Sequence, residues 1–97
     1  MSDIKKLTKL CHRIARKKGF WDSKRNVGEM LMLIVTELSE AMEAYRHSDE
    51  ENFNEEIADT FIRLFDLSGG LKIDVEKEIM KKMQKNKKRP YKHGKIC

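Results

Sequence analysis

The sequence predicts an all-α fold, arranged as an antiparallel four-helix bundle, and three observations lead to this expectation. Apolar residues recur every three or four positions in four separate segments, which is the pattern of amphipathic helices. The 97 residues include one proline and five glycines, and they show no alternating runs typical of strands. A chain of this length encloses one small core, so we expect a single domain over residues 1–97 with a basic tail from about residue 86.

The first two helices are expected over residues 3–18 and 27–46. Ser2 or Asp3 can cap the first helix, and Gly19 ends it. The second helix carries a stripe of apolar residues at helical spacing: Leu31, Ile34, Val35, Leu38, Ala41, Met42 and Tyr45. Further apolar residues make its first half apolar nearly all round, and one partner helix cannot cover such a surface. We therefore expect this helix to supply both the bundle core and a subunit interface.

The third helix is expected over residues 53–68, with Asn52 as the first residue of a capping-box pattern. Its apolar stripe is centred on Phe61, which we expect to be a core residue. Gly69 and Gly70 follow directly. Because glycine commonly ends a helix, we expect the helix to stop there.

The fourth helix is expected to run from Asp74, as its N-cap, to about Lys88. Charge along the whole chain is divided into three blocks. Residues 1–28 hold nine Lys or Arg against two Asp or Glu, residues 29–76 hold three against thirteen, and residues 77–97 hold nine against one. A helical protein that only binds nucleic acid has no need of the acidic middle, so a nucleic-acid partner is not expected. A protein that binds a metal ion and a polyphosphate together needs both signs of charge.

No segment of the sequence predicts a membrane helix or a secretion signal. The longest apolar run, residues 30–35, is far shorter than the stretch of about 18 residues that a membrane span requires. The first ten residues lack the apolar core of a signal peptide, and Cys11 and Cys97 are too few for a disulfide framework. We therefore expect a cytoplasmic protein with free thiols and no membrane partner.

Two pairs of acids stand out. Glu37 and Glu40 form an ExxE in the second helix, and Glu56 and Asp59 form an ExxD in the third. Acids three residues apart lie on one helix face, about 5–6 Å apart at Cβ, and two antiparallel helices can bring both pairs together. Carboxylates gathered in this way repel one another, and a hard divalent cation such as Mg²⁺ removes that repulsion. The alternative is an ordinary solvated face, because most of these acids lie opposite the apolar stripes of their helices.

The order of these motifs resembles that of the MazG-like all-α nucleotide pyrophosphohydrolases, which belong to the superfamily of the dimeric dUTPases. Three segments carry the resemblance: GFWDSKRNVGEMLMLIVTELSEAMEAYR, NEEIADTFIRLFDL and KMQKNKKRPYKHGK. The resemblance covers roughly residues 19–95. ExxE and ExxD are weak motifs alone, but their order before a Lys-x-x-x-Asn-x-x-Arg element and a late glycine, Gly94, is more specific.

The resemblance implies an enzyme that cleaves a nucleoside triphosphate between its α and β phosphates and releases a monophosphate and pyrophosphate. The implied catalytic acids and ligands of Mg²⁺, with Mn²⁺ as the alternative ion, are Glu37, Glu40, Glu56 and Asp59. One of them, Glu40, is the candidate for orienting or deprotonating the attacking water. The implied phosphate-binding residues are Lys82, Asn86 and Arg89, and the implied base-binding residues are Phe20 and Trp21. A homodimer or homotetramer is also implied, in which a neighbouring subunit can complete the site.

Several alternatives stay open at the level of the residues. Phe20 and Trp21 fit a plug over the end of the bundle as well as they fit a base site. Glu43 fits either a residue that supports the metal ligands or a surface acid. The chain as a whole could be a helical module that binds nucleic acid or protein without catalysis, or a family member that binds nucleotides without turnover.

Overall fold

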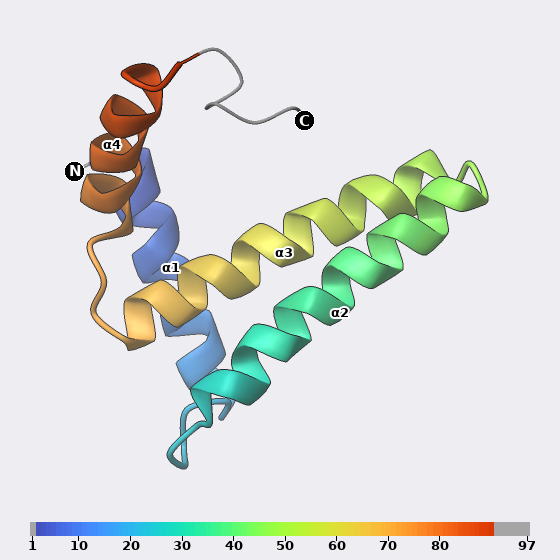
Figure 1. Ribbon diagram of the computed structural model, residues 1–97. Coiled ribbons are helices and arrows are strands. Elements are labelled where there is room, and N and C mark those ends of the chain that lie inside the picture. Colours follow the sequence, from blue (N-terminus) through green and yellow to red (C-terminus); the bar gives the residue numbers. More distant parts are fainter. Residues whose placement is uncertain (1, 91–97) are drawn as a thin grey trace.

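The computed structural model describes residues 2–90, and this part of the chain folds into four α-helices and no strands (Figure 1). The helices are α1 (Asp3–Lys17), α2 (Val27–Arg46), α3 (Glu50–Gly70) and α4 (Val75–Lys87). The predicted all-α class is confirmed. None of these helices is long and apolar enough to cross a lipid bilayer.

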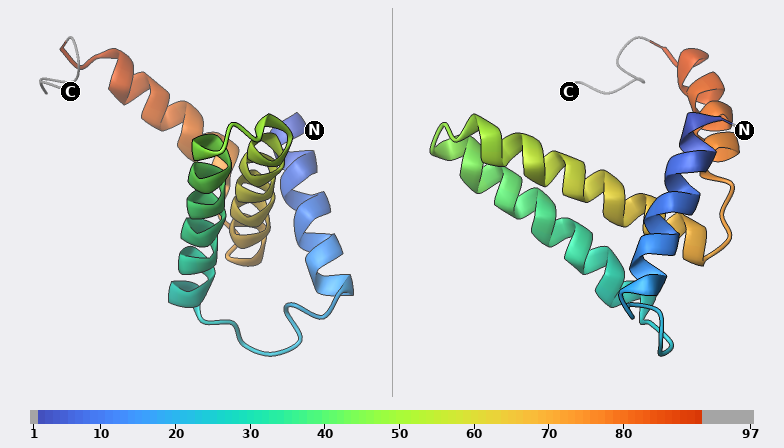
Figure 2. Two further views of the ribbon diagram at one scale, coloured as in Figure 1. Left: turned by 90° about the vertical axis from the view of Figure 1, so that its right-hand side faces the viewer. Right: turned by 180° about the vertical axis from the view of Figure 1, so that it is seen from behind.

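The longest two helices, α2 and α3, form an antiparallel hairpin (Figures 1 and 2). α1 packs against α3, and α4 packs against α1 at the end of the molecule remote from the hairpin turn. The Ser2 hydroxyl donates a hydrogen bond to the Glu76 carboxylate and ties the start of α1 to the first turn of α4. Within one chain, α4 is therefore joined to the α1–α2–α3 layer through α1.

Side-chain caps place most helix ends where the sequence predicts them. Ser2 Oγ accepts a hydrogen bond from the Lys5 backbone N–H, and Asp74 Oδ1 accepts one from the Lys77 N–H. Gly19 ends α1 in the left-handed region, at φ 86°, where a side chain would be strained.

The start of α3 was expected at the wrong residue. The helix begins at Glu50, and its N-cap is Asp49, whose Oδ1 accepts a hydrogen bond from the Asn52 N–H. Asn52 is thus a residue inside the first turn. The two acids after the cap, Glu50 and Glu51, favour this earlier start because negative charge stabilises a helix N-terminus.

The end of α3 also corrects the sequence prediction, because the helix continues through Gly69 and Gly70 and stops only at Leu71. These glycines are needed for close approach to other elements. A Cβ on Gly69 would lie 2.7 Å from the His12 side chain, and a Cβ on Gly70 would lie 2.2 Å from the Trp21 ring. Their missing side chains let α1 and the α1–α2 connector, residues 18–26, lie directly on α3.

The core is small and sits where α2, α3 and the connector meet. Met30, Ile34 and Leu67 form it, and Trp21 packs against it. Further along the hairpin, α2 buries Ala41 and Ala44.

Phe61, expected in the core, is 55% exposed, so that expectation is wrong for a single chain. α3 turns Thr60 and Leu67 inward instead, two residues seven apart and so on one helix face. The apolar stripe of α2 likewise lies mostly outside the core of one chain. Its large members are 48–67% exposed, apart from the buried Ile34: Leu31, Val35, Leu38, Met42 and Tyr45.

Candidate metal centre

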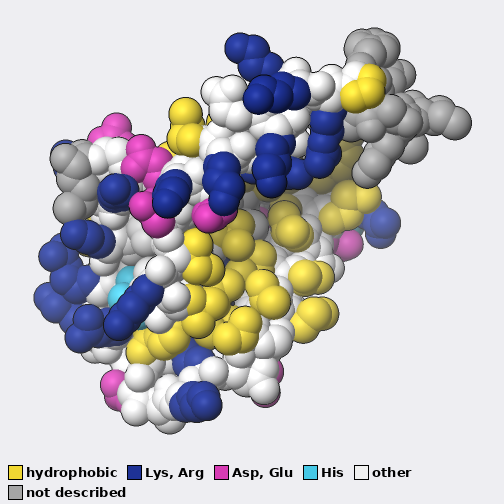
Figure 3. Space-filling model, turned by 60° about the vertical axis from the view of Figure 1, so that its left-hand side comes forward, with side chains coloured by type: hydrophobic (Ala, Val, Ile, Leu, Met, Phe, Trp, Pro, Cys, Tyr) yellow, Lys and Arg dark blue, Asp and Glu magenta, His cyan; other side chains and the backbone are white. Residues whose placement is uncertain are grey.

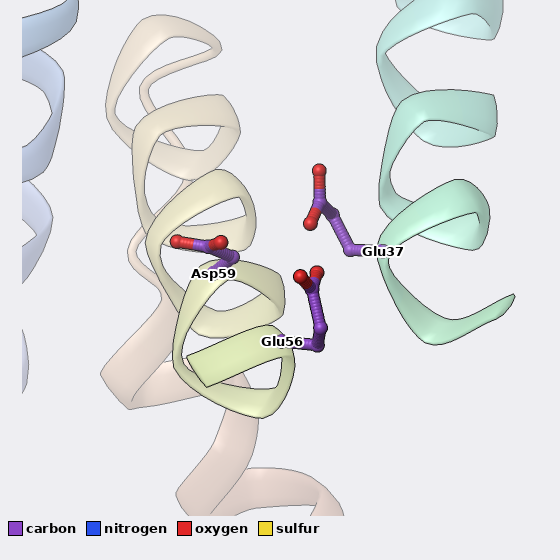
Figure 4. Close-up of side chains that lie close together, drawn as sticks. All are labelled: Glu37, Glu56 and Asp59. Carbon is purple, nitrogen blue, oxygen red and sulfur yellow. The ribbon is translucent and has the colours of Figure 1, made fainter. Parts of the chain in front are cut away.

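Three carboxylates from two helices meet between α2 and α3. Glu37 of α2 and Glu56 of α3 point toward one another, and Asp59 follows one turn later on α3 (Figure 4). Each offers an oxygen, and these oxygens all lie within 4.8 Å of one another. The antiparallel hairpin thus brings together one acid of the ExxE motif and both acids of the ExxD motif.

Glu56 is the carboxylate in the least favourable surroundings. Its Oε2 is buried and finds no hydrogen-bond donor within residues 2–90. Its contact with the Glu37 carboxyl, the loss of solvation and the nearby Glu40 raise the pKa of Glu56 to about 7. Below that pH the Glu56 carboxyl carries a proton that it can share with a neighbouring carboxylate, and a bound cation would take the place of that proton.

Glu37 has a partner of its own, the guanidinium of Arg63 on α3. Arg63 Nε donates to Glu37 Oε1 at 3.1 Å, and the Glu37 side chain is 12% exposed. Arg63 lies four residues after Asp59 and seven after Glu56, so it is on the same face of α3. A fixed positive charge therefore stands directly beside the acidic cluster.

Glu40 and Glu43 lie on the solvent side of this arrangement. Both are exposed, and both line a neighbouring hollow of about 270 Å³ that Glu56 borders as well. Glu40 is close enough to Glu56 to raise its pKa, although it is not one of the three carboxylates that converge. Glu43 is not one of the three converging carboxylates either, and its own carboxylate lies 3.4 Å from His47 Nδ1.

A hollow of about 390 Å³ opens beside the carboxylates, between α1 and the α2–α3 hairpin. Its acidic end holds Glu37 and Asp59. The charged residues on its other walls are Lys18, Arg25, Arg63 and Asp66, and the apolar ones are Ile14, Ala15, Phe20, Leu33 and Ile62. A ligand here would meet acids at one end, cations along the sides and an apolar surface between them.

The two residues expected at the base site are separated by the fold. Phe20 lines the hollow and is 60% exposed. Trp21 packs against Gly70 and the core, and it lines a different hollow on the outer side of α1. For Trp21, this placement matches the alternative of a plug at the end of the helices.

Asp66 fixes Trp21 in that position. It is 8% exposed, and its Oδ1 accepts a hydrogen bond from Trp21 Nε1 at 2.8 Å. The same Oδ1 lies 2.9 Å from His12 Nδ1, and Arg25 approaches Oδ2 at 3.5 Å while stacking over the Trp21 ring. One carboxylate thus joins α1, the connector and α3.

The residues expected to bind phosphate lie on or just after α4. Lys82 and Arg89 are exposed, and the half-buried Asn86 has an Oδ1 without a hydrogen-bond partner within residues 2–90. None of the three lines the hollow beside the carboxylates of its own chain. The late glycine of the motif, Gly94, and the end of the basic tail fall outside the described residues.

Sequence reasoning did not single out four charged residues of the hollow: Lys18, Arg25, Arg63 and Asp66. A signal for two of them was present. Arg63 and Asp66 follow Asp59 by four and seven residues, and they interrupt an otherwise apolar segment. Charged residues at helical spacing from a metal-ligand motif extend the same face of the helix.

The donor set fits a hard divalent cation. All three converging groups are carboxylates, and Mg²⁺ and Mn²⁺ prefer oxygen ligands. The unpartnered Glu56 Oε2 is an oxygen that a cation would satisfy. Fold and site therefore define a helical protein with a cluster of three carboxylates, suited to a cation, next to a partly basic hollow.

The chain belongs to the MazG nucleotide pyrophosphohydrolase domain family, whose model matches residues 25–93. That stretch includes α2, α3 and α4, and with them all three converging carboxylates. No curated protein and no solved structure was found to match the chain.

Proposed function

We propose that this chain is a metal-dependent nucleoside triphosphate pyrophosphohydrolase, which cleaves its substrate between the α and β phosphates. The observation that carries the proposal is the convergence of Glu37, Glu56 and Asp59, two of which, Glu37 and Asp59, line one end of a hollow that also holds three cations. Membership of the MazG nucleotide pyrophosphohydrolase domain family supports it.

In this proposal Glu37, Glu56 and Asp59 hold Mg²⁺, with Mn²⁺ as the alternative ion. Bound there, the ion supplies charge neutralisation at the phosphoryl oxygens and a more acidic water. Glu40, exposed beside Glu56, is the residue we assign to orienting the attacking water or taking its proton. The cations of the hollow attract the triphosphate to a site that would otherwise repel it.

We further propose that the working form is a homo-oligomer. The apolar stripe of α2 is uncovered in one chain, and α3 adds the exposed Phe61 and Leu64. Figure 3 shows hydrophobic side chains gathered into a continuous area beside a row of Lys and Arg side chains. A surface of this kind is typical of a subunit interface. In the oligomer, a partner's α4 can bring the cations of the Lys-x-x-x-Asn-x-x-Arg element to the carboxylates.

The oligomer is tested by sedimentation or light scattering of Phe61→Glu beside the wild-type chain. We expect the wild type to form dimers or tetramers and Phe61→Glu to be monomeric and less active. Lys72→Glu, a change at an exposed residue beyond the end of α3, is the control for added negative charge. A monomeric wild-type chain with full activity contradicts the proposal.

The activity is tested by measuring pyrophosphate release from a panel of ribo- and deoxynucleoside triphosphates, with Mg²⁺ or with EDTA. We expect release only with the metal, and a loss of at least about a hundredfold in Glu56→Gln. Glu55→Gln is the matched control, because Glu55 is an exposed neighbour outside the carboxylate cluster. Equal turnover in Glu56→Gln and Glu55→Gln would refute the metal centre.

A further inference from the structure

The hollow raises a question about which cations meet the phosphates of a ligand. The expected phosphate-binding residues on α4 do not line it in the same chain. Within the described residues its cationic lining consists of Lys18, Arg25 and Arg63. A phosphate chain next to Glu37 and Asp59 therefore first meets two cations of the α1–α2 connector and one of α3.

These three cations differ in how many of their hydrogen-bond donors are already used by other residues of the chain. Arg25 is held between Asp66 and the Trp21 ring, and its side chain is 18% exposed. Lys18 is an exposed residue that caps the C-terminus of α1. Arg63 is the one that touches the acidic cluster, through a hydrogen bond from Nε to Glu37.

The hydrogen bonding of Arg63 leaves most of its guanidinium available. A guanidinium has five N–H donors, and Nε carries one of them. Within residues 2–90, Arg63 has no side-chain partner other than Glu37, and its side chain is 40% exposed along the wall of the hollow. The two terminal NH₂ groups form a planar fork that matches the geometry of phosphate oxygens.

We infer that Arg63 binds the phosphate chain of the substrate with its terminal NH₂ groups while its Nε holds Glu37 in place. The inference rests on the proposed function and adds a phosphate-contacting residue on the same helix as Glu56 and Asp59. Because α3 is rigid and carries all three side chains on one face, the cation and the phosphate contact keep a fixed spacing. Arg63 then offsets the negative charge that a triphosphate brings to the acidic end of the hollow.

Binding measurements on the whole chain test this role without requiring turnover. The probe is inorganic tripolyphosphate with Mg²⁺, followed by calorimetry, and Mn²⁺ binding is measured separately. We expect Arg63→Gln to weaken tripolyphosphate binding by about tenfold to a hundredfold. Mn²⁺ binding should change much less. Arg46→Gln, at an exposed arginine at the end of α2, should bind both like the wild type.

Arg63→Lys is the second variant, since it keeps the charge and the stem of the side chain but not the fork. We expect it to restore part of the tripolyphosphate affinity and to raise KM more than it lowers kcat. Unchanged tripolyphosphate affinity in folded Arg63→Gln overturns the inference. Equal loss of Mn²⁺ and tripolyphosphate binding also overturns it, because Arg63 would then act only by positioning Glu37.

The failure of this inference can be told apart from the failure of the proposed function. If the wild-type chain binds tripolyphosphate through Arg63 but hydrolyses no nucleotide, the proposed activity fails and the phosphate contact stands. If the wild-type chain hydrolyses nucleotides and Arg63→Gln does so with an unchanged KM, the activity stands and the phosphate contact fails. A wild-type chain that binds no tripolyphosphate contradicts the contact directly.

Discussion

Two carboxylate sites lie along one face of α3, and they are built in opposite ways. Asp66 is buried, and three side chains from elsewhere in the chain approach it: Trp21, His12 and Arg25. Glu56, ten residues earlier, has a buried oxygen with no donor in the described part of the chain, and its neighbours are three acids, Glu37, Glu40 and Asp59.

The difference separates a structural acid from one suited to a ligand. A buried carboxylate that the protein itself satisfies holds elements together, whereas one surrounded by other carboxylates costs stability until a cation arrives. If this comparison is right, removing Asp66 should damage the fold, and removing the charge of Glu56 should spare it.

The largest effect on stability is expected for Asp66→Ala. The change leaves His12, Arg25 and the Trp21 N–H without their common acceptor and detaches the connector from α3. We expect the free energy of unfolding to fall by about 3–5 kcal/mol, measured by urea denaturation in EDTA. Asp22→Ala, at an exposed acid of the same connector, is the control. A loss no larger than that of the control would mean that Asp66 is not the structural acid.

Gly70→Ala should produce the next largest effect. The new methyl group would lie 2.2 Å from the Trp21 ring, so the ring must move away from its hydrogen bond with Asp66. We expect a loss of about 1–3 kcal/mol in thermal or urea unfolding, even though alanine is the better helix former. A gain in stability would show that Trp21 does not rest on this glycine.

The smallest expected effect is a pH dependence that belongs to the Glu56 cluster. Since the pKa of Glu56 is raised to about 7, the protonated carboxyl favours the folded state, and its contribution is lost as the pH rises through that value. In EDTA we therefore expect the melting temperature to decline between about pH 5 and pH 8. Mg²⁺ should restore it at the upper end, as followed by differential scanning fluorimetry.

The control for this pH dependence is a pair of variants. Glu56→Gln removes the titrating group and should flatten the decline, while Glu55→Gln should leave it as in the wild type. An equally steep decline in Glu56→Gln would assign the pH dependence to other groups.

Of the four acids that the sequence predicts together, Glu37, Glu56 and Asp59 converge and Glu40 does not, and the three that converge depend on local geometry. Glu56 and Asp59 lie three residues apart on any helix, and Glu37 needs only an antiparallel neighbour to join them. The caps at Ser2 and Asp74 are predicted for the same reason, since a cap acts within its own first turn.

What the sequence does not predict depends on contacts between distant segments. The stripe around Phe61 is apolar, but periodicity does not tell whether the same chain or a second copy covers it. Asp66 finds its partners 41 to 54 residues earlier in the sequence. Gly69 and Gly70 resemble a helix stop in the sequence. In the structure, glycine is needed there because the side chains of His12 and Trp21 approach too closely for a Cβ.

The spacing of the charged residues along α3 has a consequence for the hollow beside them. Four charged residues follow one another along one side of α3 at intervals of three, four and three residues: Glu56, Asp59, Arg63 and Asp66. From Glu56 to Asp66 the helix rises about 15 Å, at roughly 1.5 Å per residue. Inserting one residue between Asp59 and Arg63 would turn everything beyond it by about 100°. If the proposed phosphate contact is right, the spacing of these charges along α3 sets the distance between the cation ligands and the phosphate contact, and only an insertion of about a whole turn would keep them on one face.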